Sequence, residues 1–196
     1  MQRQIRAGFD DETVTVYQAY SPAIAEPAVR SGRFVPPFKV DRMTWIKPSF
    51  LWMMYRCGWA TKAGQERVLA VSITRAGFEW ALANAELSHY VRDVHPDRAT
   101  WQRRLKQAPA RVQWDPERDL RLAELPYRSL QLGLGGVAVP RYVDEWTTGI
   151  TDVTGLVREI RGLLDSGDES AASALLPVER PYPLPPETAA QLGATR

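Results

Sequence analysis

TVTVYQAYSPAIAEPAVRSG, residues 13–32, is the stretch of sequence that decides the fold class. Its first eight residues alternate in polarity and are rich in β-branched and aromatic side chains, which predicts a strand over 13–20. Ser21 followed by Pro22 is typical of a helix start, because serine can cap the first amides and proline fits the first turn. Ser31-Gly32 is typical of a helix end, so the strand is followed by a predicted helix over 23–30.

The same two kinds of element are predicted along the rest of the chain. Strands are expected at 44–46, 68–73, 111–114 and 129–132, and helices at 48–57, 75–87, 98–107, 154–164 and 169–176. The helix over 48–57 is apolar on all sides, which predicts a place at the centre of the domain. Residues 115–119 have the composition of a turn, and the glycines at 133–136 predict a hairpin between two strands.

This pattern predicts an α+β fold, in which a mixed or antiparallel sheet is flanked by helices. Residues 1–176 are expected to form a single compact domain. Residues 177–196 contain five prolines and are predicted to be an extended or disordered tail. Docking of this proline-rich tail on a partner protein is one function that the composition suggests.

Composition limits the class of protein. The 196 residues carry a net charge of +2 and are 44% hydrophobic, which is ordinary for a globular domain. No apolar run approaches the ~20 residues that cross a bilayer, and no secretory signal is visible near Met1. We therefore expect a cytoplasmic protein without a membrane partner, and the oligomeric state stays open. Cys57 is the only cysteine, which excludes an intrachain disulfide.

Positive charge is concentrated in two segments. Residues 30–62 hold seven Lys or Arg against one acid, and residues 98–141 hold nine against four, whereas residues 144–196 hold four against nine. Arginine supplies 21 of the 25 basic residues, and its planar guanidinium group suits phosphate. The expected partner is therefore anionic, either a nucleotide or a nucleic acid.

Two short motifs have the residue types of a cofactor site but not the context. Residues 89–97 have the pattern H-x-x-x-D-x-H-x-D, but Pro96 interrupts the helix that would bring these side chains together. Residues 133–138 fit the dinucleotide pattern G-x-G-x-x-A, but Pro140 and several valines follow where a helix is needed. No metal is therefore expected, and the glycine motif is interpreted as a turn.

Residues 16–34 also resemble the opening motif of the ADP-ribosyltransferase superfamily. In that superfamily a strand ends in an aromatic, a polar and a small residue, and the following helix closes on a step like Ser31-Gly32-Arg33-Phe34. Residues 44–55 resemble the second motif, a strand bearing Ser or Thr that leads into an aromatic helix. The resemblance implies a seat for nicotinamide made by Gln18 and Ala19, with Tyr20 or Tyr55 stacked on the ring.

The third motif of that superfamily, a strand carrying a catalytic glutamate, is matched only in part. The strand expected around 128–133 offers Gln131, which can bind a ribose hydroxyl but carries no charge. The resemblance thus implies either a divergent NAD-dependent ADP-ribosyl transferase with an arginine-lined phosphate site, or a nucleotide-binding protein without this chemistry. The implied catalytic residues are Gln131, Tyr20 and Glu124, and the implied NAD-binding residues are Gln18, Ala19, Lys47, Tyr55, Arg56 and Arg128.

A second resemblance covers more of the chain. Residues 43–56, 115–119 and 128–134 resemble signatures of the family called domain of unknown function 4291, and this resemblance spans most of residues 10–165. It implies a single-domain soluble protein and brings no activity with it.

The alternative to a nucleotide site is a non-catalytic RNA- or DNA-binding surface on the basic segment 98–121. Arginine and lysine would contact phosphates there, and a tryptophan would stack on bases. The residues expected to form this surface are Arg103, Arg104, Lys106, Arg111 and Arg118, with Trp101 or Trp114 as the stacking platform.

Overall fold

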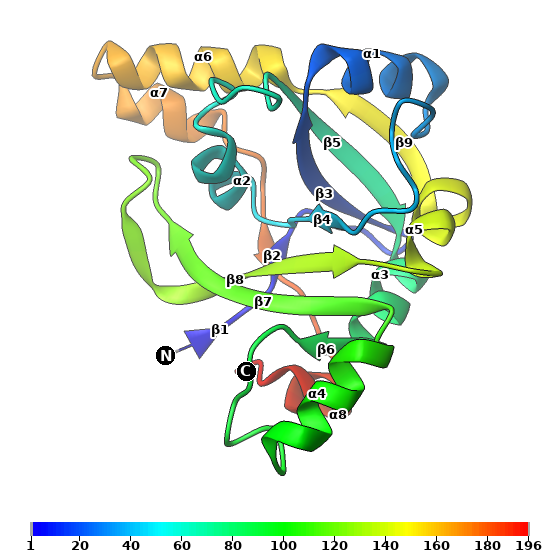
Figure 1. Ribbon diagram of the computed structural model, residues 1–196. Helices are drawn as coiled ribbons and strands as arrows, with labels where there is room; N and C mark the ends of the chain where they lie inside the picture. Colours follow the sequence, from blue (N-terminus) through cyan, green and yellow to red (C-terminus); the bar gives the residue numbers. More distant parts are fainter. Residues whose placement is uncertain (1, 196) are drawn as a thin grey trace.

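The structure is a computed structural model that describes residues 2–195, and its strands form two main sheets (Figure 1). The mixed sheet has the order β1-β8-β7-β6, and β4 also pairs with β8. Its strands are β1 (Gln2–Arg3), β4 (Thr44–Ile46), β6 (Ala85–Leu87), β7 (Ala110–Arg118) and β8 (Glu124–Leu134). The antiparallel sheet has the order β3-β5-β9. Its strands are β3 (Thr13–Tyr20), β5 (Arg67–Thr74) and β9 (Thr147–Asp152).

The two sheets meet where Tyr17 and Lys47 exchange backbone hydrogen bonds, with N···O distances of 2.7 and 3.2 Å. Apolar side chains of both sheets are buried together, among them Val16 and Val71 from one sheet and Leu132 from the other. A third, short ladder joins β2 (Arg6–Ala7) to β10 (Arg180–Pro181). The α+β class with mixed and antiparallel sheets, predicted from the sequence, is therefore confirmed.

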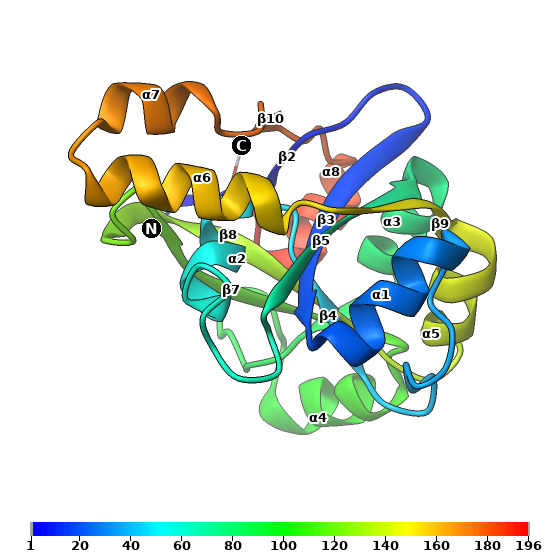
Figure 2. The same ribbon diagram turned by 90° about the horizontal axis from the view of Figure 1, so that it is seen from above.

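Helices cover both ends of this arrangement. Figure 2 shows α6 and α7 lying together beside α2, and Figure 1 shows α4 and α8 at the opposite end of the molecule. The helices are α1 (Pro22–Ser31), α2 (Phe50–Cys57), α3 (Arg75–Ala83), α4 (Arg98–Gln107), α5 (Ala138–Arg141), α6 (Thr154–Asp165), α7 (Glu169–Ala174) and α8 (Pro186–Leu192), and a π-helix spans Tyr142–Trp146. No helix among the described residues is long and apolar enough to cross a membrane.

Helix α2 is buried less completely than its apolar sequence predicts. Phe50, Met53 and Met54 pack in a buried cluster with α6, as expected for a central helix. Tyr55 is 41% exposed, however, because the opposite side of this short helix faces solvent.

The glycines at 133–136 do not form a hairpin between two strands. Gly136 has a φ of +49°, and the chain then enters α5 and the π-helix. Val139, Tyr142, Val143 and Trp146 lie at helical spacing and are all buried. The valines and Pro140 indicated strands rather than a helix in the sequence. Pro140 is nevertheless tolerated, because proline in the first turn of a helix removes no hydrogen bond.

Two other boundaries differ from the prediction because long-range pairing overrides the local signal. The helix expected over 75–87 ends at Ala83, and residues 85–87 instead pair with β7 as a parallel strand. Of the turn expected at 115–119, residues 115–118 lie inside β7, and the chain turns only after Asp119. Pro116 coincides with a register shift between Pro116 and Arg118, where a missing amide is tolerated.

The proline-rich segment after residue 176 is docked on the domain rather than free. Figure 2 shows β10 beside β2, and the segment continues into α8. Tyr182 is 5% exposed, and the indole Nε1 of Trp114 donates to the carbonyl of Leu192 at 2.8 Å. The part before α8 is extended, whereas residues 186–192 are helical, which the prediction of an extended or disordered tail did not include. Apolar side chains between the prolines supply the burial that holds the segment in place.

Candidate active site

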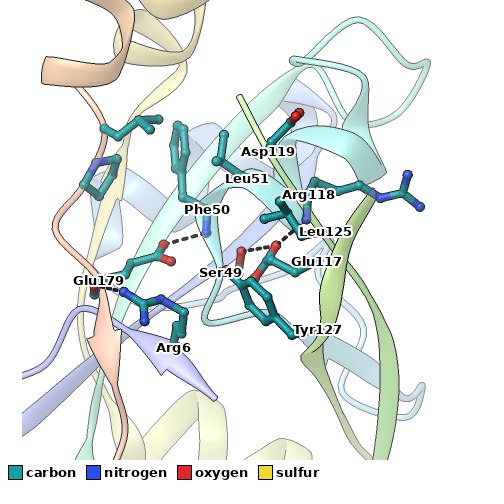
Figure 3. A pocket seen from close by; sticks show the side chains of 12 residues that line it. Arg6, Ser49, Phe50, Leu51, Glu117, Arg118, Asp119, Leu125, Tyr127 and Glu179 are labelled. Carbon is teal, nitrogen blue, oxygen red and sulfur yellow. Dashed lines mark hydrogen bonds between the residues drawn. The ribbon is translucent and has the colours of Figure 1, made fainter. Parts of the chain in front are cut away.

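The start of α2 holds two carboxyl groups. Ser49 caps the helix, since its Oγ accepts from the amide of Trp52 at 3.2 Å, and the same hydroxyl donates to Oε1 of Glu117 at 2.9 Å. The next residue, Phe50, donates its amide to Oε1 of Glu179 at 2.7 Å. Consecutive residues thus anchor two glutamates that are far apart in the sequence (Figure 3).

These glutamates line a cavity of about 240 Å³ between α2, β7, β8 and the segment that leads to β10. The aromatic ring of Tyr127 and the guanidinium-bearing side chain of Arg6 also line it (Figure 3). The residues that complete the lining are Ser49, Phe50, Leu51, Arg118, Asp119, Leu125, Leu176 and Pro177. A cavity of this size admits one ring of a ligand, and a larger ligand extends into solvent.

Glu117 is the more deeply buried of the pair. It follows Pro116 at the register shift in β7, and its side chain is held by Ser49 and by the amide of Arg118, which donates to Oε1 at 2.9 Å. Only 4% of the residue is exposed. Burial raises the pKa of the Glu117 carboxyl above its usual range, because the charged form loses its hydration.

Glu179 also has a carboxyl group with a raised pKa. Burial raises the pKa of its carboxyl to about 8, the hydrogen bond from Phe50 opposes this, and the nearby charge of Glu117 adds to the rise. Two neighbouring carboxyl groups resist ionising together, so the pair retains a proton near neutral pH. A carboxylic acid that keeps its proton at neutral pH is what general acid catalysis requires.

Arg6 provides positive charge beside this pair. Its Nη2 donates to the backbone carbonyl of Glu179 at 2.8 Å. None of the ion pairs formed among the described residues includes Arg6. Its charge favours the ionised forms of both glutamates, and its guanidinium lines the cavity, where it can also contact an anionic group of a ligand.

The raised pKa of Glu179 predicts a specific dependence of stability on pH. Between about pH 4.5 and 8 the folded protein keeps a proton that the unfolded chain loses, so the free energy of unfolding falls as the pH rises. Glu179→Gln removes this loss. We expect the wild type to lose about 3 kcal/mol more than the variant between pH 5 and 8, roughly 6–12 °C in Tm.

Thermal unfolding of both proteins across this pH range measures the effect. Glu187→Gln, at an exposed position of α8, controls for the removal of one carboxylate. Parallel pH profiles of the wild type and Glu179→Gln would contradict the raised pKa.

The residues implied to seat nicotinamide form an internal hydrogen-bond network instead of lining this cavity. Gln18 is 2% exposed, and its Nε2 lies 2.7 Å from both Tyr20 Oη and Thr44 Oγ1. Tyr142 donates to Oε1 of Gln18 at 2.6 Å. Ala19 lies beside them on β3, partly buried against the α2 cluster.

Lys47, Tyr55 and Arg56 do not line this cavity either. Lys47 is 6% exposed and donates to the carbonyl of Trp45 at 3.1 Å, and burial lowers its pKa to about 7. Tyr55 lies on the exposed side of α2, where the guanidinium of Arg118 stacks 3.6 Å from its ring centroid. Arg56 is exposed on the same helix.

The residues implied for the third motif occupy three positions. Arg128 donates to the carbonyl of Trp114 at 2.8 Å, and Gln131 donates to Oδ2 of Asp115 at 2.8 Å. Glu124 is 64% exposed at its side chain and pairs with Arg118 at 3.1 Å. The structure therefore does not bring the implied NAD-binding and catalytic residues into one cavity.

The alternative nucleic-acid surface is also divided. Arg103, Arg104 and Lys106 are exposed on α4 and enter no ion pair among the described residues, whereas Arg111 and Arg118 lie on β7. The indole Nε1 of Trp101 donates to Leu87, and Trp114 is 9% exposed. Trp114 is thus buried and Trp101 is only partly exposed, so binding through α4 stays a prediction that rests on charge.

The two histidines of the H-x-x-x-D-x-H-x-D pattern differ in burial and in hydrogen-bond partner. His95 is buried, with Nε2 2.9 Å from Glu86 Oε1, while His89 is exposed and contacts Ser88. Among residues 2–195 no group of three or more His, Cys, Asp or Glu is arranged to hold a metal ion.

Sequence reasoning missed Glu117, Glu179 and Arg6. Glu117 lay in a segment interpreted as a turn, and Glu179 lay in the expected tail. The one available signal was the segment 115–119, which carries a signature of domain of unknown function 4291.

An α+β fold that buries two carboxyl groups beside an arginine defines a protein with a candidate acid–base site. The chain belongs to the family described as Domain of unknown function (DUF4291), whose model matches residues 4–182. All residues that line the cavity fall within this match. No curated protein matches the chain.

Proposed function

We propose that this protein is an enzyme that breaks the glycosidic bond of a nucleotide, with Glu117 and Glu179 as its carboxyl pair. The observation that carries the proposal is the shared cavity, in which two glutamates with raised pKa values are fixed by consecutive residues of one helix. Paired carboxyl groups are the usual catalysts of glycosidic cleavage, because the bond needs both a proton for the leaving group and a base or anion at the sugar.

The different environments of the two glutamates assign their roles. Glu179 keeps its proton near neutral pH and gives it to the leaving base as the bond between that base and C1 of the sugar breaks with its electron pair. Ionised Glu117 stabilises the positive charge that develops on the sugar. Water or an acceptor hydroxyl then adds to C1, and its proton passes to Glu117.

Arg6 and the size of the cavity support a nucleotide as substrate. A volume of about 240 Å³ accommodates a single ring next to the glutamates. The guanidinium of Arg6, which lines the cavity, suits the phosphate of such a substrate. NAD, which the sequence resemblance implies, is one candidate, and a nucleoside monophosphate is another.

The two candidate substrates differ in whether the leaving base needs a proton from Glu179. Nicotinamide leaves NAD as a neutral molecule without a proton, whereas adenine leaving AMP must be protonated. Incubation with NAD or AMP between pH 5 and 9, with the released base measured by chromatography, tests the proposal. We expect base release, and with AMP we expect the rate to fall as the pH rises past about 8, where Glu179 loses its proton.

Glu179→Gln gives the matching test of roles. Release of adenine should be lost in this variant, and release of nicotinamide should persist. Absence of base release from both substrates would overturn the proposed function.

A further inference from the structure

A second cavity, of about 350 Å³, shares no lining residue with the candidate active site. It is formed by the end of β3, α1 and the loop that leads into β4. The residues that line it are Tyr20, Ile24, Pro37, Phe38, Lys39, Arg42, Met43 and Thr44.

The floor of this cavity offers a hydroxyl hydrogen that has no acceptor. Oε1 of Gln18 accepts from Tyr142 Oη, so the other atom is the amide nitrogen, whose two hydrogens face Tyr20 Oη and Thr44 Oγ1 at 2.7 Å, while the carbonyl of Trp45 is more distant at 3.3 Å. The two hydroxyls lie 3.0 Å apart, and one hydrogen bond joins them. Of their two hydrogens, one is used there, and the other has no partner among the described residues.

The walls of the cavity are apolar, and its rim is basic. Ile24, Phe38 and Met43 give it apolar walls. Lys39 and Arg42 are exposed at the rim, and no ion pair among the described residues includes either of them. Asp41 lies between them in the sequence and pairs with neither, so the rim carries net positive charge.

We propose that this cavity is a binding site for a nucleoside monophosphate. An apolar, planar base fits the walls, and its ring oxygen or nitrogen accepts the hydrogen that Tyr20 or Thr44 leaves unused. The phosphate lies at the rim, where Lys39 and Arg42 form charge-assisted hydrogen bonds with it. This site does not depend on the glutamate pair or on the proposed glycosidic cleavage.

The test uses pseudouridine monophosphate, whose base is joined to the sugar by a carbon–carbon bond and is therefore not released by glycosidic hydrolysis. Calorimetric titration of the full chain should show binding. Pseudouridine without its phosphate should bind at least about tenfold more weakly, since the rim then has no anion to contact.

Two kinds of variant locate the ligand. Lys39→Ala combined with Arg42→Ala, both at exposed positions, should weaken binding about tenfold or more, and Ile24→Trp should abolish binding by filling the cavity. Arg6→Ala removes the guanidinium that the candidate active site would offer to the same ligand, so the rim and wall variants are also measured in the Arg6→Ala background, where the remaining binding belongs to this cavity. Loss of all binding in Arg6→Ala, unchanged binding when the rim and wall substitutions are added to Arg6→Ala, or no binding to the wild type would each overturn the proposal.

Discussion

Replacing Glu117 by glutamine is expected to lower the rate of base release by about a thousandfold. Glutamine has the same shape and still accepts the hydrogen bond from Ser49, so the start of α2 keeps its anchor. It cannot carry the negative charge that faces the developing cation on the sugar, nor can it accept a proton from the attacking water. Initial rates of base release by the two proteins measure the loss.

Glu124→Gln is the matched control, because Glu124 is the residue that the sequence resemblance implies as catalytic. Its carboxylate is largely exposed and does not line the cavity, although its partner Arg118 does. We expect its rate to stay within about threefold of the wild type. A large loss in Glu124→Gln together with a small loss in Glu117→Gln would assign catalysis to the sequence-implied residue and reject the carboxyl pair.

Gly77→Ala is expected to destabilise the fold by about 3 kcal/mol or more, which lowers Tm by roughly 6–12 °C. In most helices this exchange is stabilising, because alanine is the better helix former. At Gly77, however, an added Cβ would lie 2.3 Å from Cγ of Trp146, and that indole is 3% exposed and packed against Trp80. The clash involves a buried ring close to its own backbone, so either α3 or the π-helix must shift.

Gly162→Ala is expected to raise the free energy of unfolding of the same protein, whereas Gly77→Ala lowers it. Gly162 lies in α6, and nothing approaches within 4 Å of the added methyl group. We expect a gain of about 0.5–1 kcal/mol from the helix preference alone. Thermal unfolding of both variants tests the pair of predictions, and a Gly77→Ala protein as stable as Gly162→Ala would show that α3 does not pack on Trp146.

The elements that the sequence predicts well are those whose signals are local. The alternation over Thr13–Tyr20, the Asp97 cap of α4 and the apolar stripe of α6 each lie within a short window, and all three elements are present. The side chain of Asp97 accepts from the amide of Thr100 at 2.7 Å, as a capping residue should.

The candidate site could not be predicted in the same way, because its parts meet only in three dimensions. Ser49 and Glu117 are 68 positions apart, and Phe50 and Glu179 are 129 apart. The prolines around Glu179 indicate an extended chain, but the docking of that chain depends on burial of residues such as Tyr182 against distant elements. Local composition therefore describes the conformation of this segment correctly and says nothing of where it lies.

The ladder between β2 and β10 also determines when the site comes into existence during synthesis. Arg6 leaves the ribosome early, and its partner in the cavity, Glu179, is made 173 positions later. Until the segment around Arg180 has emerged and paired with Ala7, the nascent chain can fold α2 and β7 and place Glu117 but has no acid beside it. The proposed glycosidic cleavage therefore requires this late segment, and a chain cut short before Glu179 lacks one of the two carboxyl groups.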